Sequence, residues 1–195
     1  MAQNYLLFMA KYHAWAYESL FEKIKDMPDD IYFADAGLVF RSIHGTLCHL
    51  YAGDQFWMTL LMNEEVDEEI KNKNQSHWMR EDIYAKPGDA QSHWEEIIPD
   101  RKELEKALIQ QSKKFKDFLE ANPQYTKIGA DNTPAFTLQI GFYPGDLENH
   151  LAFLHVFNHR THHVGQITAA ASRLWKPLDH LDLLDYMFVD MKNSE

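Results

Sequence analysis

Apolar residues recur at three- and four-residue intervals along four long segments, which is the period of an amphipathic helix. In the second segment, for example, Val39, Ile43 and Leu47 fall on one face. Helices are therefore expected over residues 4–27, 39–62, 100–122 and 146–173. Four long helices bury their apolar stripes by packing together, so the predicted fold is an all-α four-helix bundle.

Prolines and acidic residues mark the ends of the predicted helices. Pro28 and Pro123 should end the first and third helices, since the residue before a proline is pushed out of the helical region. Asp100, with Glu103 three residues later, resembles a capping box at the start of the third helix. Asp146, which follows a Pro-Gly turn, is expected to cap the fourth helix.

Three other segments complete the expected architecture. Residues 63–99 form a polar connection of unusual length, in which Asp89 is expected to cap a short helix over "AQSHWEEI". Residues 124–143 contain "FTLQIGFY", whose loose alternation predicts a short hairpin or extended excursion. A short C-terminal helix is expected in "DHLDLLDYMF". Residues 1–195 are predicted to be a single domain.

Composition and charge narrow the classes of function. The chain is 45% hydrophobic and 13% aromatic, which is enough for a packed core. Its net charge of -11 repels phosphate backbones and anionic lipid, so binding to nucleic acid or to a membrane is not expected. The N-terminus lacks the basic region of a signal peptide, and Cys48, the only cysteine, has no disulfide partner. We therefore expect a cytoplasmic protein, with Cys48 in its core.

The stretch "HVFNHRTHHVGQI", residues 155–167, contains the most distinctive pattern in the chain. His155, His159 and His163 follow each other at four-residue steps, which places them on one face of a helix. Two neutral imidazoles at this spacing can chelate one metal ion. His162 is turned about 100° away and is expected to face elsewhere. His155 could support a ligand or simply extend the polar stripe.

A further ligand is needed, and the second predicted helix offers His44 and His49. His49 is preferred, because Gly45 and Gly53 lie one turn before and after it on the same face. Such small neighbours leave volume around the imidazole that a ligand or a closely approaching helix would fill. Asp54, five residues after His49, could orient a ligand or accept a proton, but a helix-surface or capping role is equally compatible with its position.

Three histidines would leave one coordination position for water or substrate, whereas closed structural zinc sites have four protein ligands. The open coordination position favours a catalytic metal site over a structural one. The glutamate of an H-E-x-x-H protease is absent, so peptide hydrolysis is disfavoured. The alternative is that the histidines are packed, hydrogen-bonded core residues. That role, or a surface position, is expected for the remaining histidines: His13, His77, His93, His150 and His180.

Three stretches resemble the DinB (damage-inducible) family of four-helix bundles: "MAKYHAWAYESLFEKI", "FRSIHGTLCHLYAGDQFW", and "NHRTHHVGQI" followed by "PLDHLDLLDYM". The likeness covers most of the chain and is least characteristic in residues 63–99 and 124–143. It implies a metal held by His49, His159 and His163, in agreement with the spacing argument, and it implies a homodimer. Related members of the wider superfamily use their metal to activate a low-molecular-weight thiol for transfer or isomerisation, whereas many others have no assigned reaction.

Two hypotheses of function follow. The first is a metal-dependent enzyme that binds a divalent transition metal, with zinc or nickel foremost, and activates a small thiol or water for attack on a small-molecule substrate. Its reaction would be of the thiol S-transferase, isomerase or hydrolase type. The second is a non-catalytic metal-binding protein, related to stress or to protein interactions. The family's name suggests contact with DNA, but the charge argues against it.

Overall fold

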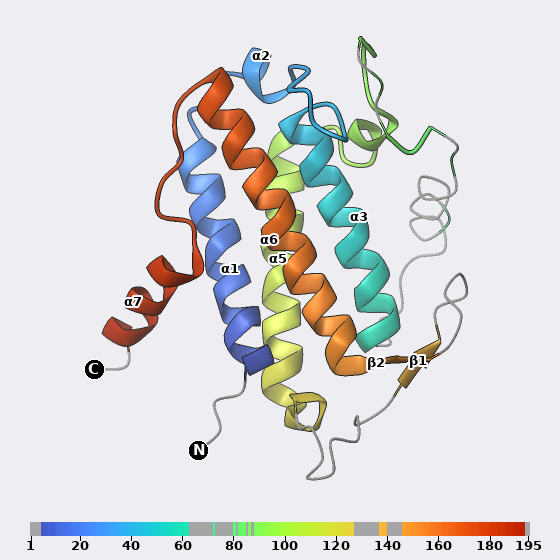
Figure 1. The fold of residues 1–195 in the computed structure, drawn as a ribbon, viewed down its shortest axis with the longest axis vertical. Coiled ribbons are helices and arrows are strands. Elements are labelled where there is room, and N and C mark those ends of the chain that lie inside the picture. Colours follow the sequence, from blue (N-terminus) through green and yellow to red (C-terminus); the bar gives the residue numbers. More distant parts are fainter. Residues whose placement is uncertain are drawn as a thin grey trace.

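The computed structural model describes residues 5–62, 72, 80, 82–84, 86, 88–126, 137–139 and 146–193. Four long helices lie side by side as a bundle (Figure 1): α1 (Tyr5–Ile24), α3 (Ile43–Met62), α5 (Arg101–Ala121) and α6 (Asn149–Leu174). Helices α1 and α3 each contact both α5 and α6, so α1 and α3 lie on one diagonal of the bundle. The predicted all-α four-helix bundle is confirmed.

The remaining elements are short. They are α2 (Asp29–Tyr32), η1 (His93–Glu96), η2 (Pro123–Thr126), β1 (Thr137–Gln139), β2 (Asp146–Glu148) and α7 (Leu183–Asn193). Strands β1 and β2 pair antiparallel, with Thr137 opposite Glu148. β1 lies within the predicted excursion, whereas β2 lies just beyond it. Most of the 63–87 connection, including His77, and most of residues 127–145 lie outside the described residues.

Buried apolar stripes at helical spacing hold the bundle together. On α5, Leu104, Leu108, Phe115 and Leu119 are all fully buried. Burying a side chain of this kind stabilises the fold by about 1.5–3 kcal/mol. Tyr17 of α1 and Leu47 of α3 belong to one buried cluster, and Phe153 and Phe157 of α6 belong to a second cluster toward the other end of the helices.

Several helix boundaries differ from the prediction. Asp100 caps α5 as expected, accepting hydrogen bonds from the backbone N–H groups of Lys102 (2.9 Å) and Glu103 (2.8 Å). The second long helix begins at Ile43 and not at 39, because residues 38–41 form a tight turn closed by a Leu38–Arg41 bridge. α1 ends at Ile24, a few residues before the predicted end.

Two predicted caps are wrong. Asp89 does not cap the short helix; Ser92 does so, and Glu95 completes a capping box with it. Asp146 lies in strand β2 opposite Gln139, and the residue before α6 is Glu148, whose side chain forms no capping hydrogen bond. At η1 the local cap thus lies three residues beyond the predicted one, and at α6 the pairing of β2 with β1 takes the place of a local cap.

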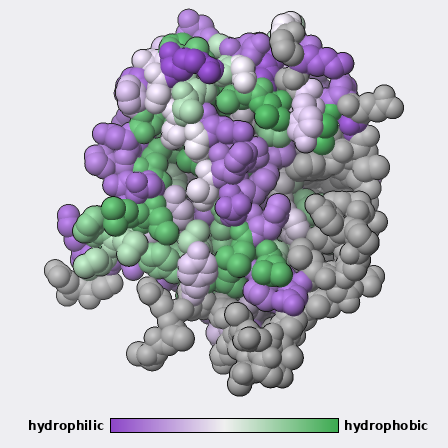
Figure 2. Space-filling model, viewed as in Figure 1, coloured by the Kyte–Doolittle hydropathy of each residue, from purple (hydrophilic) through white to green (hydrophobic). Residues whose placement is uncertain are grey.

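Helix α7, the expected short C-terminal helix, packs against α1. The hydroxyl of Tyr12 donates to the carbonyl of Leu181 at 3.1 Å, and the ring of Tyr186 contacts Phe8, Tyr12 and Trp15. The opposite face of α7 is apolar and exposed, and Figure 2 shows this surface at the lower left. Its large side chains are Leu184, Met187, Phe188 and Met191. Within the described part of the chain, no helix combines the length and the apolar character of a membrane span.

Candidate metal centre

The three predicted ligands meet between α3 and α6. The Nε2 atom of His159 lies 3.0 Å from Nε2 of His49 and 3.1 Å from Nε2 of His163. One ligand atom from each of the three residues lies within 4.8 Å of the others. The four-residue step along α6 places His159 and His163 one turn apart, and the packing of α3 on α6 brings His49 to them.

Two of the three nitrogen separations approach those around a common metal ion. Two nitrogen ligands bound at about 2.0–2.1 Å to one tetrahedral ion lie about 3.3 Å apart. The two measured Nε2 separations, 3.0 and 3.1 Å, are close to that value. Within the described residues, the group includes no fourth histidine, cysteine or carboxylate.

Hydrogen bonds between the rings explain this arrangement less well than a bound metal ion does. Nδ1 of His163 lies 2.8 Å from Oε1 of Gln166, and Nε2 of Gln166 lies 3.2 Å from Nε2 of His162. The amide group therefore donates to His162 and accepts from Nδ1–H of His163, so Nε2 of neutral His163 carries only a lone pair. Nε2 of His159 has one hydrogen at most to share between two neighbouring nitrogens. A cation accepts all three lone pairs at once.

Burial keeps the three imidazoles in the neutral form that binds metal. Burial lowers the pKa of His49 well below its usual value, and the neighbouring His159 and His163 lower it further. It lowers the pKa of His159 to about 3, with His163 contributing. The pKa of His163 falls to about 4, mainly through burial, although its hydrogen bond to Gln166 opposes the shift. All three rings are thus unprotonated at neutral pH.

Two aromatic rings surround the imidazole of His49. The ring of Phe40 stacks on it at 3.8 Å between centroids, and Trp94 of η1 meets it edge-on at 4.8 Å. The expected open volume beside His49 is therefore filled by aromatic side chains. Gly45 has a different purpose from the one predicted: a Cβ there would lie 2.2 Å from the carbonyl oxygen of Phe40, so the glycine permits a close backbone approach.

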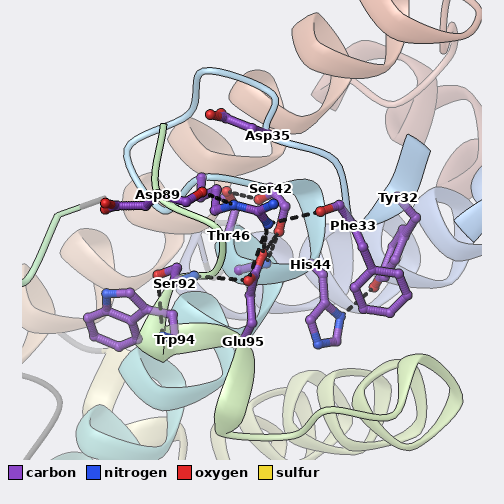
Figure 3. A network of polar contacts seen from close by, with 12 residues as sticks. Tyr32, Phe33, Asp35, Ser42, His44, Thr46, Asp89, Ser92, Trp94 and Glu95 are labelled. Carbon is purple, nitrogen blue, oxygen red and sulfur yellow. Dashed lines mark hydrogen bonds and ion pairs between the residues drawn. The ribbon is translucent and has the colours of Figure 1, made fainter. Parts of the chain in front are cut away.

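The residues that follow Phe40 and Trp94 in the chain belong to a buried polar network (Figure 3). The carboxylate of Glu95 accepts from the guanidinium of Arg41 (3.0 Å), the backbone N–H of Ser92 (3.0 Å) and the hydroxyl of Ser42. Arg41 has a positive φ of 73°, a conformation that costs energy for a side chain of its kind and is retained here by these bonds. The network thus links Arg41 and Ser42, beside Phe40, to Glu95, beside Trp94.

Asp54 has neither of its predicted roles. It is buried and pairs with Arg160 of α6 at 2.9 Å, so it is neither a surface or capping carboxylate nor a partner of the histidine ligands. Burial raises the pKa of Asp54, and the guanidinium of Arg160 opposes that shift. The arginine is the partner that sequence reasoning missed, because an interhelical pair has no fixed spacing in the sequence.

The other predicted residues are distributed as follows. Cys48 is in the core, as expected, with its Sγ 3.6 Å from Nε2 of His44, whose own Nδ1 lies 3.4 Å from the hydroxyl of Tyr32. His155 is exposed; its ring stacks against that of His159 and lies tilted against that of Trp57. The other histidines described are His13 (buried), His93 and His150 (half-buried), and His162 and His180 (exposed).

Three residues around the ligands were not predicted: Phe40, Trp94 and Gln166. Gln166 follows His163 by three residues on one helix, so its spacing was a usable signal. Phe40 and Trp94 lie outside the helices that carry the ligands, and nothing in their local sequence connects them with His49.

Comparison with known proteins agrees with the resemblance of the helices. The family model described as "DinB family" matches residues 1–193. The chain is 27% identical over 161 residues to "Protein DinB" of Bacillus subtilis (strain 168), a match that covers 82% of this chain and 80% of that protein. No solved structure matches the chain. With a family match that spans nearly its whole length, the chain belongs to the DinB family.

Proposed function

We propose that His49, His159 and His163 hold one divalent transition-metal ion, and that the protein is a metal-dependent enzyme acting on a small molecule. The observation that carries this proposal is the convergence of three neutral imidazoles, with Nε2 separations of 3.0 and 3.1 Å, from two helices. Membership of the DinB family is compatible with it. Zinc and nickel are the ions we expect, since imidazole suits both.

The residues around the proposed site orient the histidine ligands and keep them uncharged, and none of them is assigned the role of a general base. Gln166 fixes the tautomer of His163 by accepting a hydrogen bond from its Nδ1–H, which leaves Nε2 free to bind a cation. Phe40 and Trp94 cover His49, which is only 4% exposed, and shield it from water. Asp54 is engaged with Arg160 and does not act as a proton acceptor at the site.

The reaction we propose is the activation of a low-molecular-weight thiol, or of water, for attack on a small electrophile. When bound, a divalent ion lowers the pKa of a coordinated thiol or water, and so generates the nucleophile near neutral pH. The neutral ligand set leaves the full charge of the ion available for this effect. No carboxylate belongs to the group among the described residues, which suits a thiol that requires no separate base.

Elemental analysis of protein purified without an affinity tag tests the metal site. Wild type and His155→Ala should contain about one ion per chain, and His159→Ala should contain almost none. His155 is the matched control, because it lies one turn from His159 on the same stripe and stays outside the ligand group. Equal, negligible metal in all three proteins, even after incubation with zinc or nickel, would contradict the proposal.

A panel of small thiols with an electrophilic reporter then tests catalysis. We expect a rate that depends on both the metal and one class of thiol, and that is lost in His159→Ala. Stoichiometric metal without turnover by any thiol or by water would favour the non-catalytic alternative, a metal-binding stress-related or interaction protein.

A further inference from the structure

An ion pair in the centre of the bundle joins the two helices that carry the histidine ligands. Nε of Arg160 on α6 donates to Oδ1 of Asp54 on α3 at 2.9 Å, and the two side chains are 0% and 1% exposed. Arg160 directly follows His159, and Asp54 follows His49 by five residues. The pair therefore lies within about two helical turns of the ligands on both helices.

The guanidinium of Arg160 reaches the other two long helices as well. Its central carbon lies 4.5 Å from the ring centroid of Phe115 on α5 and 5.6 Å from that of Tyr17 on α1. Both rings are fully buried, and aromatic faces attract a cation. One side chain of α6 thus contacts the other three long helices of the bundle.

Stability alone is a poor explanation for this pair. Removing two charges from water costs more than their attraction commonly returns, and apolar replacements of buried pairs are often as stable. Specificity of register is a better explanation. The apolar residues of α6 in the two buried clusters lie at helical spacing, as Phe153, Val156 and Ile167 do, so their contacts could re-form after a slip of one turn. A buried charge with one partner is satisfied in a single register.

We propose that the Asp54–Arg160 pair fixes the register of α6 against α3, and so holds His159 and His163 opposite His49. A slip of one turn would move the rings about 5.4 Å, which is enough to separate nitrogens that now lie 3.0 Å apart. Arg160 is turned about 100° from His159 around the helix, so it acts through the backbone of α6 and not on the ligands. It is a positioning residue. Its consequence for metal binding rests on the proposed function.

The test compares wild type with the double variant Asp54→Leu/Arg160→Met, which removes both charges together. The first readout needs no metal: nuclear Overhauser effects between the ring protons of His49 and His159, whose centroids are 5.0 Å apart. The second readout is the affinity for Co²⁺ and its visible absorption spectrum. Urea unfolding reports stability separately. Leu104→Ala, at a fully buried position on α5, is the control for a loss of stability that leaves the charged pair intact.

We expect the urea midpoint of unfolding of the double variant to equal or exceed that of wild type. The variant should lose the nuclear Overhauser effects between the two rings and bind Co²⁺ about ten- to a hundredfold more weakly. Leu104→Ala should keep the ring contacts and the Co²⁺ affinity of wild type. A folded double variant with unchanged ring contacts and unchanged Co²⁺ affinity would overturn the proposal. If the ring contacts are lost in the variant but wild type binds no Co²⁺, the register role stands and the metal site fails.

Should the double variant not fold, Asp54→Asn replaces it. The amide oxygen keeps an acceptor for Nε of Arg160 and removes the negative charge. At equal unfolding midpoint, Asp54→Asn should show weaker ring contacts and weaker Co²⁺ binding than Leu104→Ala, and equality between the two variants would overturn the proposal.

Discussion

At the scale of the residue, Gly45 marks the closest backbone approach beside the site. A Cβ at this position would lie 2.2 Å from the carbonyl oxygen of Phe40, a contact that only a shift of the backbone could relieve. We predict that Gly45→Ala destabilises the protein by about 1–3 kcal/mol and displaces Phe40 from His49. Urea unfolding measures the loss.

Gly165 on α6 provides the matched control, because a Cβ there meets nothing within 4 Å. Gly165→Ala should stabilise the helix by about 0.5–1 kcal/mol, since alanine loses less backbone entropy than glycine. Equal effects of the two substitutions would mean that the backbone at Phe40 can shift without a loss of stability.

The buried side chain of His13 should make the free energy of unfolding depend on pH. It is buried against Phe157 with stacked rings, and burial lowers its pKa well below the usual value, with the charge of Arg160 adding to the shift. Below about pH 6.5 the unfolded chain binds a proton at this residue that the folded protein does not, so the free energy of unfolding falls as pH falls.

Urea unfolding of metal-free wild type and His13→Phe at pH 7 and pH 5 measures this contribution. The variant should lose up to about 2 kcal/mol less than wild type over that interval. His180→Gln is the control with the opposite sign, because the hydrogen bond that His180 donates to Asp185 raises the pKa of His180 and favours the folded state in acid. Equal losses in wild type and His13→Phe would contradict the assignment of a buried, neutral His13.

At the scale of the element, η1 is held against the start of α3 by Glu95. This carboxylate is 5% exposed and accepts bonds from Arg41, Ser42 and Ser92. Glu95→Gln leaves the guanidinium of Arg41 without its charge partner, so we predict a loss of about 2–4 kcal/mol in the free energy of unfolding.

The neighbouring Glu96 is exposed and supplies the control. Glu96→Gln should change stability by no more than about 0.5 kcal/mol in the same urea titration. If the two substitutions have the same effect, the network of Glu95 does not anchor η1.

At the scale of the whole molecule, the homodimer implied by the family resemblance stays a prediction, as does the single domain. The surface we expect the dimer to use is the exposed stripe of α7, where Leu184, Met187 and Phe188 are 58%, 43% and 57% exposed. A stripe at this spacing can pair with the same stripe of a second copy about a twofold axis. Exposed apolar surface of this kind commonly marks an interface.

Sedimentation velocity over a range of concentrations tests this surface. Wild type should sediment as a dimer, and Met187→Ser/Phe188→Ser should shift toward the monomer. Leu151→Ser, which alters an exposed leucine on α6, should leave the assembly unchanged. A wild type that stays monomeric, or a dimer that is indifferent to the α7 substitutions, would count against α7 as the interface.

The sequence by itself determined the long helices and the histidine pair, because both depend on periods that repeat along one segment. The stripes of α1, α3, α5 and α6 were readable for that reason, as was the step from His159 to His163. His49 could also be predicted, although the reason given for it, open space beside Gly45 and Gly53, was wrong at Gly45, which accommodates the backbone of Phe40.

Tertiary structure alone decided which distant segments complete the site. Phe40 and Trp94 reach His49 from a turn and from η1, and Asp54 finds Arg160 more than a hundred residues away. The cap predicted at Asp146 failed for the same reason, since the pairing of β1 with β2 replaced it. The cap predicted at Asp89 was wrong for a local reason, since Ser92 and Glu95 form a capping box three residues further along. Local spacing constrains neighbours on one helix, whereas contacts between segments depend on how the whole core packs, and no interval in the sequence encodes that packing.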